Sequence, residues 1–421
     1  MENSTHIHWF RNDLRLHDQE FIHLLKDKNQ FLGVYLLNPA DFALTQFGFR
    51  KTGLLRLRWL RESLQCLQQN LRQKGSELLV LCGNPHTILP ELVMRFDASL
   101  SYSSIPASEE MEVEKQLHSK LDTAKIFKFS SGSLVDENLI LKAFPNFTKF
   151  RFFVEKDVEK LIPNPTEKVE VLPKSPLVAP TIKVSKRSLH PQTAVPFFGG
   201  ENSALEHLNV YFENENLVKQ YKKDRNGLIG KDYSSKFSVY LANGTLSART
   251  IFRAIKDFEE SFGKNEGSHW IFVELLWRDY FRLCAKWYGN QIFHYSGYSG
   301  NSVKKCGFHQ KSFDKWKNGH TGISFIDANM IELKETGFQS NRGRQNTASF
   351  LFHDLGIDWR AGAAWFEHTL LDYDVFSNQG NWQYIIGAGA DPKGGRKFDV
   401  DWQAKHYDEF GTYQKLWEEV N

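Results

Sequence analysis

The stretch Trp270-Ile-Phe-Val-Glu-Leu-Leu-Trp-Arg-Asp-Tyr-Phe-Arg-Leu-Cys-Ala-Lys-Trp287 carries the strongest structural signal in this sequence. Its large side chains recur three or four residues apart, a spacing that places them on one face of a helix. Helical spacing continues from residue 201 to the end of the chain, and few runs there resemble strands. The second half is therefore predicted to be an all-helical domain. The residues expected on the shared face are Trp270, Val273, Glu274, Trp277 and Phe281.

The first part of the chain has a different pattern, in which short β-rich runs alternate with amphipathic stretches such as 54–73. This alternation predicts a doubly wound parallel sheet of the Rossmann-like kind. No G-x-G-x-x-G motif follows the first run, so a dinucleotide site of that type is not expected there. The expected strands are His6–Phe10, Phe31–Leu37, Glu77–Cys82, Ser99–Ser103 and Lys125–Phe129.

Between these parts the regular patterns stop, at about residues 155–200. Seven prolines in this segment deny helix continuation, and Lys, Thr and Ser dominate between them. We read it as a long connection over the surface. The predicted architecture is α/β plus all-α: an α/β domain over 1–135, which could carry a second ligand or be purely structural, an interdomain linker over 136–200 and a helical domain over 201–421.

Composition excludes several classes of protein. The chain has 421 residues, of which 41% are hydrophobic and 24% charged, which suits a two-domain globular protein. A formal net charge of +3 permits a local basic face without demanding a nucleic-acid partner. Its four cysteines are scattered, with no spacing for metal, and are expected to be reduced thiols. Neither a signal peptide nor a membrane span is apparent, so we expect a cytoplasmic protein that binds no metal.

The aromatic face around Glu274 and Trp277 has two readings. A carboxylate within an aromatic stripe is costly to bury unless it is hydrogen-bonded, so Glu274 is either an edge residue that reaches solvent or part of a pocket. In the pocket, a flat ring with polar edges would stack on Trp277 and bond to Glu274. Arg278 and Arg282 would then meet phosphates at its mouth.

Two further segments combine polar groups with core-like surroundings. The stretch Asp232-Tyr-Ser-Ser-Lys-Phe-Ser238 offers hydroxyls, a lysine and backbone N–H groups to a pyrophosphate, but it is also compatible with an ordinary turn. In Asn341-Arg-Gly-Arg-Gln345 an arginine enters an apolar helix, which requires a carboxylate such as that of Asp372 or Asp374. That pairing either joins two helices or surrounds a heteroaromatic ring.

In their order and their sequences these motifs resemble those of the cryptochrome/DNA photolyase family, and within it the cryptochrome DASH branch. The resemblance covers nearly the whole chain and is densest from 220 to 400. The motifs that carry the resemblance are His8-Trp-Phe-Arg-Asn-Asp-Leu-Arg15, Tyr221-x3-Arg-Asn-Gly-Leu228, Asp232–Ser238, Glu274-Leu-Leu-Trp-Arg-Asp-Tyr-Phe-Arg282, Asp327-Ala-Asn-Met330, Gly337-Phe-x-Ser-Asn-Arg-Gly-Arg-Gln345 and Leu371-Asp-Tyr-Asp-Val-x-Ser-Asn-x-Gly-Asn-Trp382.

The resemblance implies a role for each matching residue. Asn378 would face the flavin N5 and tune its redox state, and Glu274 and Trp277 would form the pocket for a flipped-out cyclobutane dimer. Trp382 and Trp359 would be the inner and middle members of an electron relay. The residues implied in FAD binding are Tyr221, Ser234, Ser235, Lys236, Phe237, Ser238, Arg344, Asp372, Tyr373, Asp374 and Asn378. Those implied in DNA binding are Arg225, Glu274, Trp277, Arg278, Asn341, Arg342 and Gln403.

Differences from the family pattern refine the expectation. Gln339, Ser340 and Asn341 stand where (6-4) photolyases carry a histidine pair, which disfavours (6-4) chemistry. Tyr384 replaces a second pocket Trp, as in the DASH branch, and a smaller stacking surface favours single-stranded DNA. Cys306 occupies the place of the outer relay Trp, so the hole either returns quickly to the flavin or leaves by another aromatic residue. Trp316, if it turns towards Trp359, and Trp402 are the candidates, and Trp316 is otherwise the anchor of a short amphipathic helix. Asp399 and Trp402 also replace the more usual residues beside Gln403.

The sequence therefore predicts light-driven repair of cyclobutane pyrimidine dimers in single-stranded DNA by a monomeric FAD protein, a deoxyribodipyrimidine photo-lyase. Its rival is a blue-light receptor that repairs nothing. The chain stops soon after Trp417, without the tail that signalling cryptochromes often carry, and this favours repair. A folate (methenyltetrahydrofolate) antenna between the domains is the family's usual choice, and Glu109 and Glu110 are candidates for holding it.

Overall fold

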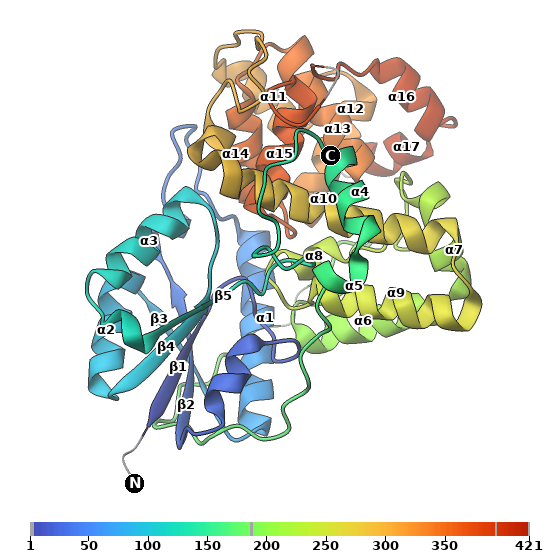
Figure 1. Cartoon of the computed structure of the whole chain (residues 1–421). Helices are drawn as coiled ribbons and strands as arrows, with labels where there is room; N and C mark the ends of the chain where they lie inside the picture. Colours follow the sequence, from blue (N-terminus) through green and yellow to red (C-terminus); the bar gives the residue numbers. More distant parts are fainter. Residues whose placement is uncertain (1–3, 186–187, 392–393, 420–421) are drawn as a thin grey trace.

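A computed structural model describes residues 4–185, 188–391 and 394–419 and divides the chain into an α/β part and a helical part (Figure 1). All five strands of the single named sheet are parallel and lie in the order β3-β2-β1-β4-β5, so the predicted fold class is confirmed. Each strand begins within one residue of its predicted start. The strands are β1 (Thr5–Phe10), β2 (Gln30–Leu37), β3 (Leu78–Cys82), β4 (Ala98–Ser103) and β5 (Ile126–Phe129).

Helices cover both faces of the sheet (Figure 1). Because side chains alternate along a strand, Ile7 and Trp9 of β1 pack with α2 and α3, whereas Phe10 packs with the leucines of α1. The first three helices are α1 (Leu54–Gln73), α2 (Pro85–Arg95) and α3 (Ser108–His118).

The segment between the domains lies along α1. Gln68 donates to the Pro180 carbonyl and accepts from the Ile182 amide, and Arg61 donates to the Lys183 carbonyl. Since proline-rich backbone cannot satisfy its own carbonyls in a helix, the polar side chains of α1 do so instead. The range 136–200, predicted as linker, also contains two helices, α4 (Phe147–Lys156) and α5 (Val158–Leu161).

The helical part is built around α10, which contacts α4, α7, α9 and α15. Gly380 allows α15 to approach α10 closely, because a Cβ at this position would stand 2.2 Å from the Phe281 ring. Its helices are α6 (Glu201–Glu213), α7 (Glu215–Asp224), α8 (Ser238–Leu241), α9 (Ala248–Phe262), α10 (Glu266–Tyr288), α11 (Gln310–Asn318), α12 (Ser324–Thr336), α13 (Asn341–Ser349), α14 (Trp359–Thr369), α15 (Val375–Ile386), α16 (Val400–Tyr407) and α17 (Thr412–Glu418). Within the described ranges, none of the helices combines the length and apolar character needed to cross a bilayer.

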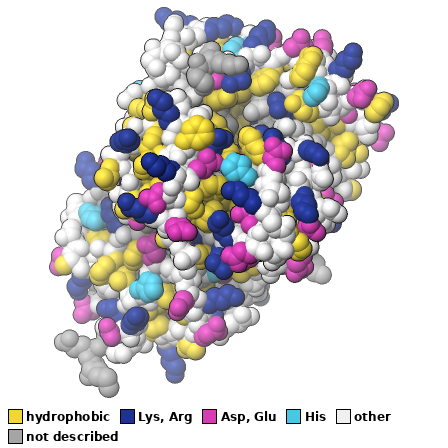
Figure 2. Space-filling model, turned by 45° about the vertical axis from the view of Figure 1, so that its right-hand side comes forward, with side chains coloured by type: hydrophobic (Ala, Val, Ile, Leu, Met, Phe, Trp, Pro, Cys, Tyr) yellow, Lys and Arg dark blue, Asp and Glu magenta, His cyan; other side chains and the backbone are white. Residues whose placement is uncertain are grey.

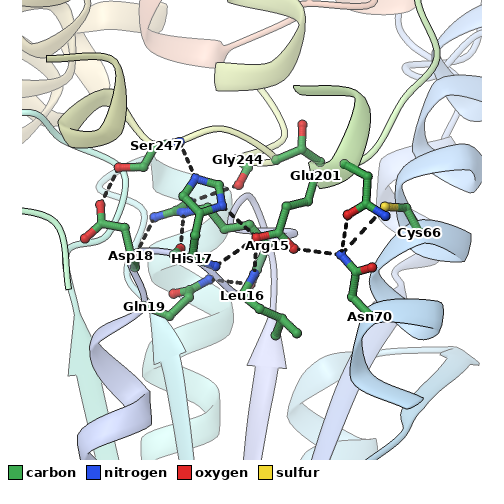
Figure 3. A network of polar contacts seen from close by, with 12 residues as sticks. Arg15, Leu16, His17, Asp18, Gln19, Cys66, Asn70, Glu201, Gly244 and Ser247 are labelled. Carbon is green, nitrogen blue, oxygen red and sulfur yellow. Dashed lines mark hydrogen bonds and ion pairs between the residues drawn. The ribbon is translucent and has the colours of Figure 1, made fainter. Parts of the chain in front are cut away.

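A buried polar network joins the two parts (Figure 3). Glu201, at the start of α6, accepts hydrogen bonds from the backbone N–H groups of Leu16 and His17 at 2.9 and 2.8 Å and from the His17 ring at 2.6 Å. Its second oxygen accepts from Asn70 of α1 at 2.9 Å. Arg15 donates to the Gly244 carbonyl at 2.9 Å. These bonds hold the polar loop after β1 against the helical domain.

Candidate functional site

A cavity of about 500 Å³, the helical-domain cavity, lies beside α10. Four of the five residues predicted to share a face line it: Trp270, Glu274, Trp277 and Phe281. Val273 is fully buried in the core, which is the one departure from the prediction. The other walls are supplied by α7, the segment 234–238, the region 338–345, and α15 with the loop before it. Their main residues are Tyr221, Arg225, Ser234, Ser235, Lys236, Phe237, Ser238, Phe338, Asn341, Arg344, Asp372, Asp374 and Tyr384.

Glu274 lies half-buried in the cavity wall and forms an ion pair with Arg225 from α7. The Arg225 guanidinium also stands 4.5 Å from the centroid of the Trp270 ring. Burial raises the pKa of Glu274, and the charge of Arg225 opposes that rise. Glu274 thus lines the cavity, as the pocket requires, and its side chain also stays 36% exposed, as that of an edge residue would.

Trp277 is held from two sides. Phe147 of α4 stacks on it at 3.6 Å between centroids and 12° between planes, and Tyr384 of α15 meets it edge-on at 6.1 Å. Phe147 lies within the predicted linker and was not predicted as part of the site. A signal was present, because Phe147, Phe150 and Val154 are spaced as one helical face.

The segment 234–238 departs from ordinary backbone geometry. Ser234 and Lys236 have φ angles of 58° and 55°, in the left-handed region that non-glycine residues seldom adopt. Such strain clusters at ligand clamps. The Lys236 ammonium, however, donates to the Tyr233 carbonyl and lies 3.1 Å from the centroid of the Tyr233 ring. Burial lowers the pKa of Lys236 to about 7. The predicted contact of this ammonium with a pyrophosphate would require it to leave the Tyr233 carbonyl.

Arg344 of α13, the arginine predicted to need a carboxylate, is partly buried. It donates to both oxygens of Asp372 at 2.9 Å and to the Gln339 carbonyl at 2.8 Å. Asp374 accepts from the Ser377 amide at 2.8 Å and thereby caps α15. Both carboxylates still line the cavity, which extends into a recess of about 80 Å³. Tyr373, Asn378 and Trp382 also line this recess.

Three other predicted contact residues are engaged elsewhere. Arg282 is buried and ion-paired with Glu137 at 2.5 Å, so it cannot meet phosphates at the cavity mouth. Gln403 is also buried and accepts a hydrogen bond from Asn346, which contradicts its expected DNA contact. Arg278 lines the cavity, but its guanidinium donates to the carbonyls of Gly132 and Leu241.

Arg342 lies just outside the cavity. Its guanidinium stands 4.5 Å from the centroid of the Tyr407 ring and donates to Asn226 at 3.3 Å. Asn341 and Arg225, the chain neighbours of Arg342 and Asn226, both line the cavity. Arg342 is therefore placed beside the cavity mouth.

The two predicted relay tryptophans are buried in one apolar cluster. Trp382 borders the recess, and the Trp359 indole donates to the Tyr295 carbonyl at 3.1 Å. Trp316, one candidate for replacing the outer relay member, is fully buried in the same cluster. Its indole donates to the Thr347 carbonyl, and its ring stacks with Phe313 and Phe366 at 5.8 and 6.2 Å.

A second cavity, of about 570 Å³, lies between the two parts of the chain and is called the interdomain cavity. It opens beyond the carboxyl ends of β1 and β4, where the strand order reverses and open α/β sheets bind ligands. Asn12 follows β1, and Glu109 and Glu110 begin the helix that follows β4. Burial raises the pKa of Glu110, while Lys51 binds Glu109 at 2.5 Å.

Surface charge is mixed rather than concentrated. On the face shown in Figure 2, Lys and Arg side chains are interspersed with Asp and Glu. A polyanion would therefore be recognised through local groups rather than through one large positive field.

Both parts of the chain are similar to known proteins. Residues 6–168 match the family model described as DNA photolyase, and residues 270–419 match the FAD binding domain of DNA photolyase. The chain is 42% identical over 431 residues to cryptochrome DASH of Synechocystis sp., covering 97% of this chain and 86% of that relative. The chain belongs to the cryptochrome/photolyase family, in its cryptochrome DASH branch.

Solved structures of a cryptochrome and a photolyase are also similar to the structure of this chain. The crystal structure of the Synechocystis cryptochrome has a TM-score of 0.92 at 40% identity, over 98% of this chain and 88% of that one. An archaeal photolyase from Sulfolobus tokodaii, crystallised with two FAD molecules, has a TM-score of 0.78 at 25% identity, over 99% of this chain and 90% of that one. The predicted resemblance is thus confirmed, and the helical part of this cryptochrome DASH-type chain is an FAD-binding domain.

The helical-domain cavity fits that cofactor. It combines apolar walls, the guanidinium groups of Arg225 and Arg344, and the carboxylates of Asp372 and Asp374. A ribityl-linked dinucleotide requires such a mixture, because its rings are flat and apolar while its edges and pyrophosphate are polar.

Proposed function

We propose that this protein is a light-driven DNA photolyase that splits cyclobutane pyrimidine dimers in single-stranded DNA. The observation that supports this most is that Glu274 and Trp277 line the same cavity as Arg344, Asp372 and Asp374. A lesion stacked on Trp277 would therefore share one enclosure with the flavin-binding groups, close enough for electron transfer without an intervening protein layer.

The FAD-binding roles follow from the geometry of each group. The carboxylate of Asp372, held by Arg344, and that of Asp374 would accept hydrogen bonds from the polar edge of the flavin. Asn378 donates its side-chain N–H to the Ala363 carbonyl at 3.0 Å, which directs its own oxygen towards the recess where it would meet N5. Bound FAD, once reduced and excited, supplies the electron that opens the dimer.

The phosphates of FAD would be held mainly by backbone. Ser234 and Lys236 are left-handed, and successive N–H groups in such turns can converge on an anion, so the segment 234–238 would offer its backbone N–H groups to the phosphates. The hydroxyls of Ser234, Ser235 and Ser238 and the phenol of Tyr221 would complete the contact, with Phe237 packed beneath them.

On the lesion side, Trp277 and Tyr384 would form the walls against which the two pyrimidines stack. Glu274 would hydrogen-bond the base edge and stabilise the charge that develops as the dimer accepts an electron. Arg225 would then exchange its ion pair with Glu274 for a phosphate. Arg278, Asn341 and Arg342 lie at or beside the cavity and would hold the flanking strand.

Preference for single-stranded DNA follows from the size of this enclosure. A dimer must leave the base stack before it can enter, and doing so in a duplex costs a few kcal/mol of pairing and stacking. Tyr384 offers a smaller ring than Trp and recovers less of that cost. An unpaired strand avoids most of it.

The interdomain cavity is proposed to hold a folate antenna. A pterin ring presents adjacent N–H donors, and the buried carboxyl of Glu110 and the neighbouring Glu109 are suitable acceptors. Tyr373 lines both this cavity and the flavin recess, so the two ligands would be separated by about one residue.

The experiment is a repair assay under blue light. Protein reduced in the dark is mixed with an oligonucleotide carrying one thymine dimer, either single-stranded or annealed to its complement, and restored thymines are quantified by chromatography. We expect repair of the single strand, much slower repair of the duplex and none in the dark. A receptor without repair activity would restore no thymine in either substrate although it binds FAD.

A further inference from the structure

An exposed aromatic stack lies on α16, outside the cavity. Trp402 is 54% exposed. Its ring stacks on the ring of His406, one helical turn later, with 4.7 Å between the ring centroids and 11° between the ring planes. Gln403, the neighbour predicted to touch DNA, points into the core instead. A single exposed ring is common on protein surfaces, but here the indole is held flat against a second ring.

A chain of contacts leads from the cavity mouth to this stack. Arg225 lines the cavity, and its neighbour Asn226 accepts a hydrogen bond from Arg342. The Arg342 guanidinium lies over Tyr407 at 4.5 Å, and Tyr407 meets His406 edge-on at 4.7 Å. Two cations at the cavity mouth are therefore followed by three adjoining rings, those of Tyr407, His406 and Trp402.

The charges around the stack are compatible with a polyanion. Asp399 is committed to capping α16, where it accepts from the Trp402 amide at 3.0 Å. Asp401 and Lys405 lie four residues apart on a neighbouring stripe of the same helix, where opposite charges offset one another. Arg342 is the cation placed over one of these rings, that of Tyr407.

Cations beside exposed rings bind single-stranded nucleic acid, because the cations follow the phosphates and a ring stacks on an unpaired base. Paired bases do not offer their faces in this way. We propose that Trp402, supported by His406, is a stacking platform for an unpaired base of the strand that flanks the lesion, with Arg342 binding the phosphate between platform and cavity. This inference rests on the proposed function in one respect: the strand that stacks on Trp402 is the strand whose lesion enters the cavity.

The test is fluorescence anisotropy with a labelled, undamaged ten-nucleotide thymidine strand and with an isolated thymine-dimer dinucleotide. Trp402→Ala should bind the ten-nucleotide strand about tenfold more weakly than wild type, the scale of one lost base–aromatic stack. Trp402→Phe should recover most of the affinity. The matched control is Phe410→Ala, which removes another exposed ring, 81% exposed, from the same region. It should bind as wild type does, and all variants should bind the dinucleotide equally.

Wild-type affinity of Trp402→Ala for the ten-nucleotide strand would overturn the platform. An equal loss for the isolated dinucleotide would do so as well, because Trp402 would then act on the cavity. Lesion recognition, on which the proposed repair function depends, is tested separately, by whether wild-type protein binds a dimer-containing strand more tightly than an undamaged one. Loss of that preference would contradict lesion recognition while leaving the platform measurable.

Discussion

At the scale of single residues, Glu274 shows what spacing can and cannot predict. Its shared face with Trp270, Trp277 and Phe281 followed from helical periodicity alone, and these four residues do line one cavity. Its partner Arg225 comes from α7, some 50 positions earlier, and no local pattern identifies that pair. The same limit explains Arg282, whose carboxylate partner Glu137 lies in a segment predicted to be linker.

Glu274→Ala should lower the repair rate roughly tenfold or more, because the carboxyl would no longer stabilise charge on the dimer. FAD should remain bound, since Glu274 lies on the lesion side of the cavity. The rate is measured with dark-reduced protein, and FAD occupancy is measured from the absorbance spectrum. Glu266→Ala, on the exposed first turn of the same helix, is the control. If Glu274→Ala repairs at the parental rate, Glu274 only lines the cavity and has no part in the reaction.

Trp277→Ala should weaken binding of a dimer-bearing strand by about 1–3 kcal/mol, the value of one base–aromatic stack. Loss of the indole also leaves Phe147 without its stacking partner, so thermal unfolding should be measured alongside anisotropy. Trp287→Phe controls for aromatic substitution in the same helix, away from the cavity. Unchanged lesion affinity in a folded Trp277 variant would remove this residue from the site.

At the scale of elements, the strands and α1 were predictable because their signals are local: alternation, apolar spacing and flanking turns. The contacts of α11 were not. Its Trp316 was predicted either to anchor the helix or to turn towards Trp359, and it stacks on Phe366, which in turn meets Trp382 edge-on at 5.2 Å. Orientation about a helix axis depends on what the neighbouring helices leave open, and that is a tertiary property.

This packing changes the route expected for light-driven reduction of oxidised FAD. Cys306 is much harder to oxidise than an indole unless it first loses its proton, so an electron would leave Trp316 and reach Trp382 across Phe366. Photoreduction should be faster in Cys306→Trp than in wild type and slower in Trp316→Phe. Absorbance under blue light with an external reductant measures both.

Trp417→Phe, in a separate apolar cluster, is the control for that comparison. Once reduced in the dark, all these variants should repair at the parental rate, because the relay is needed only to load the flavin with electrons. Equal photoreduction in wild type and Trp316→Phe would eliminate the route through Phe366.

At the scale of the whole molecule, the two parts are joined by groups far apart in the sequence. Glu201 binds Leu16 and His17, which lie about 185 positions earlier, and no motif predicts that contact (Figure 3). The interdomain cavity was likewise only partly foreseen: Glu109 and Glu110 were expected to line it, but Asp41, Arg56 and Glu367 were not. Such sites are assembled by domain docking, which sequence spacing does not encode.

The hydrogen bonds of Glu201 hold its pKa below the usual value for Glu, although burial opposes this shift. The carboxylate therefore stabilises the folded state above the ordinary Glu pKa, and this contribution is lost as pH falls through the lower folded value. Glu201→Gln should reduce the free energy of unfolding by about 1–3 kcal/mol at pH 7. The difference from wild type should shrink as the solution is acidified.

Chemical denaturation at several pH values measures this effect, with Glu206→Gln on the exposed face of the same helix as the control. A difference that stays constant down to strongly acidic pH would mean that the loss is one of packing and not of charge.

The central claim is that light absorbed by the flavin of this protein splits pyrimidine dimers. Its most direct test is the action spectrum of repair: thymines restored per absorbed photon in a dimer-containing single strand, measured at wavelengths from the near ultraviolet to green with dark-reduced protein. The account predicts that restoration follows the absorption of reduced FAD and, where a folate is bound, an added antenna band. Restoration of no thymine at any wavelength, by protein with FAD bound and reduced, would contradict it.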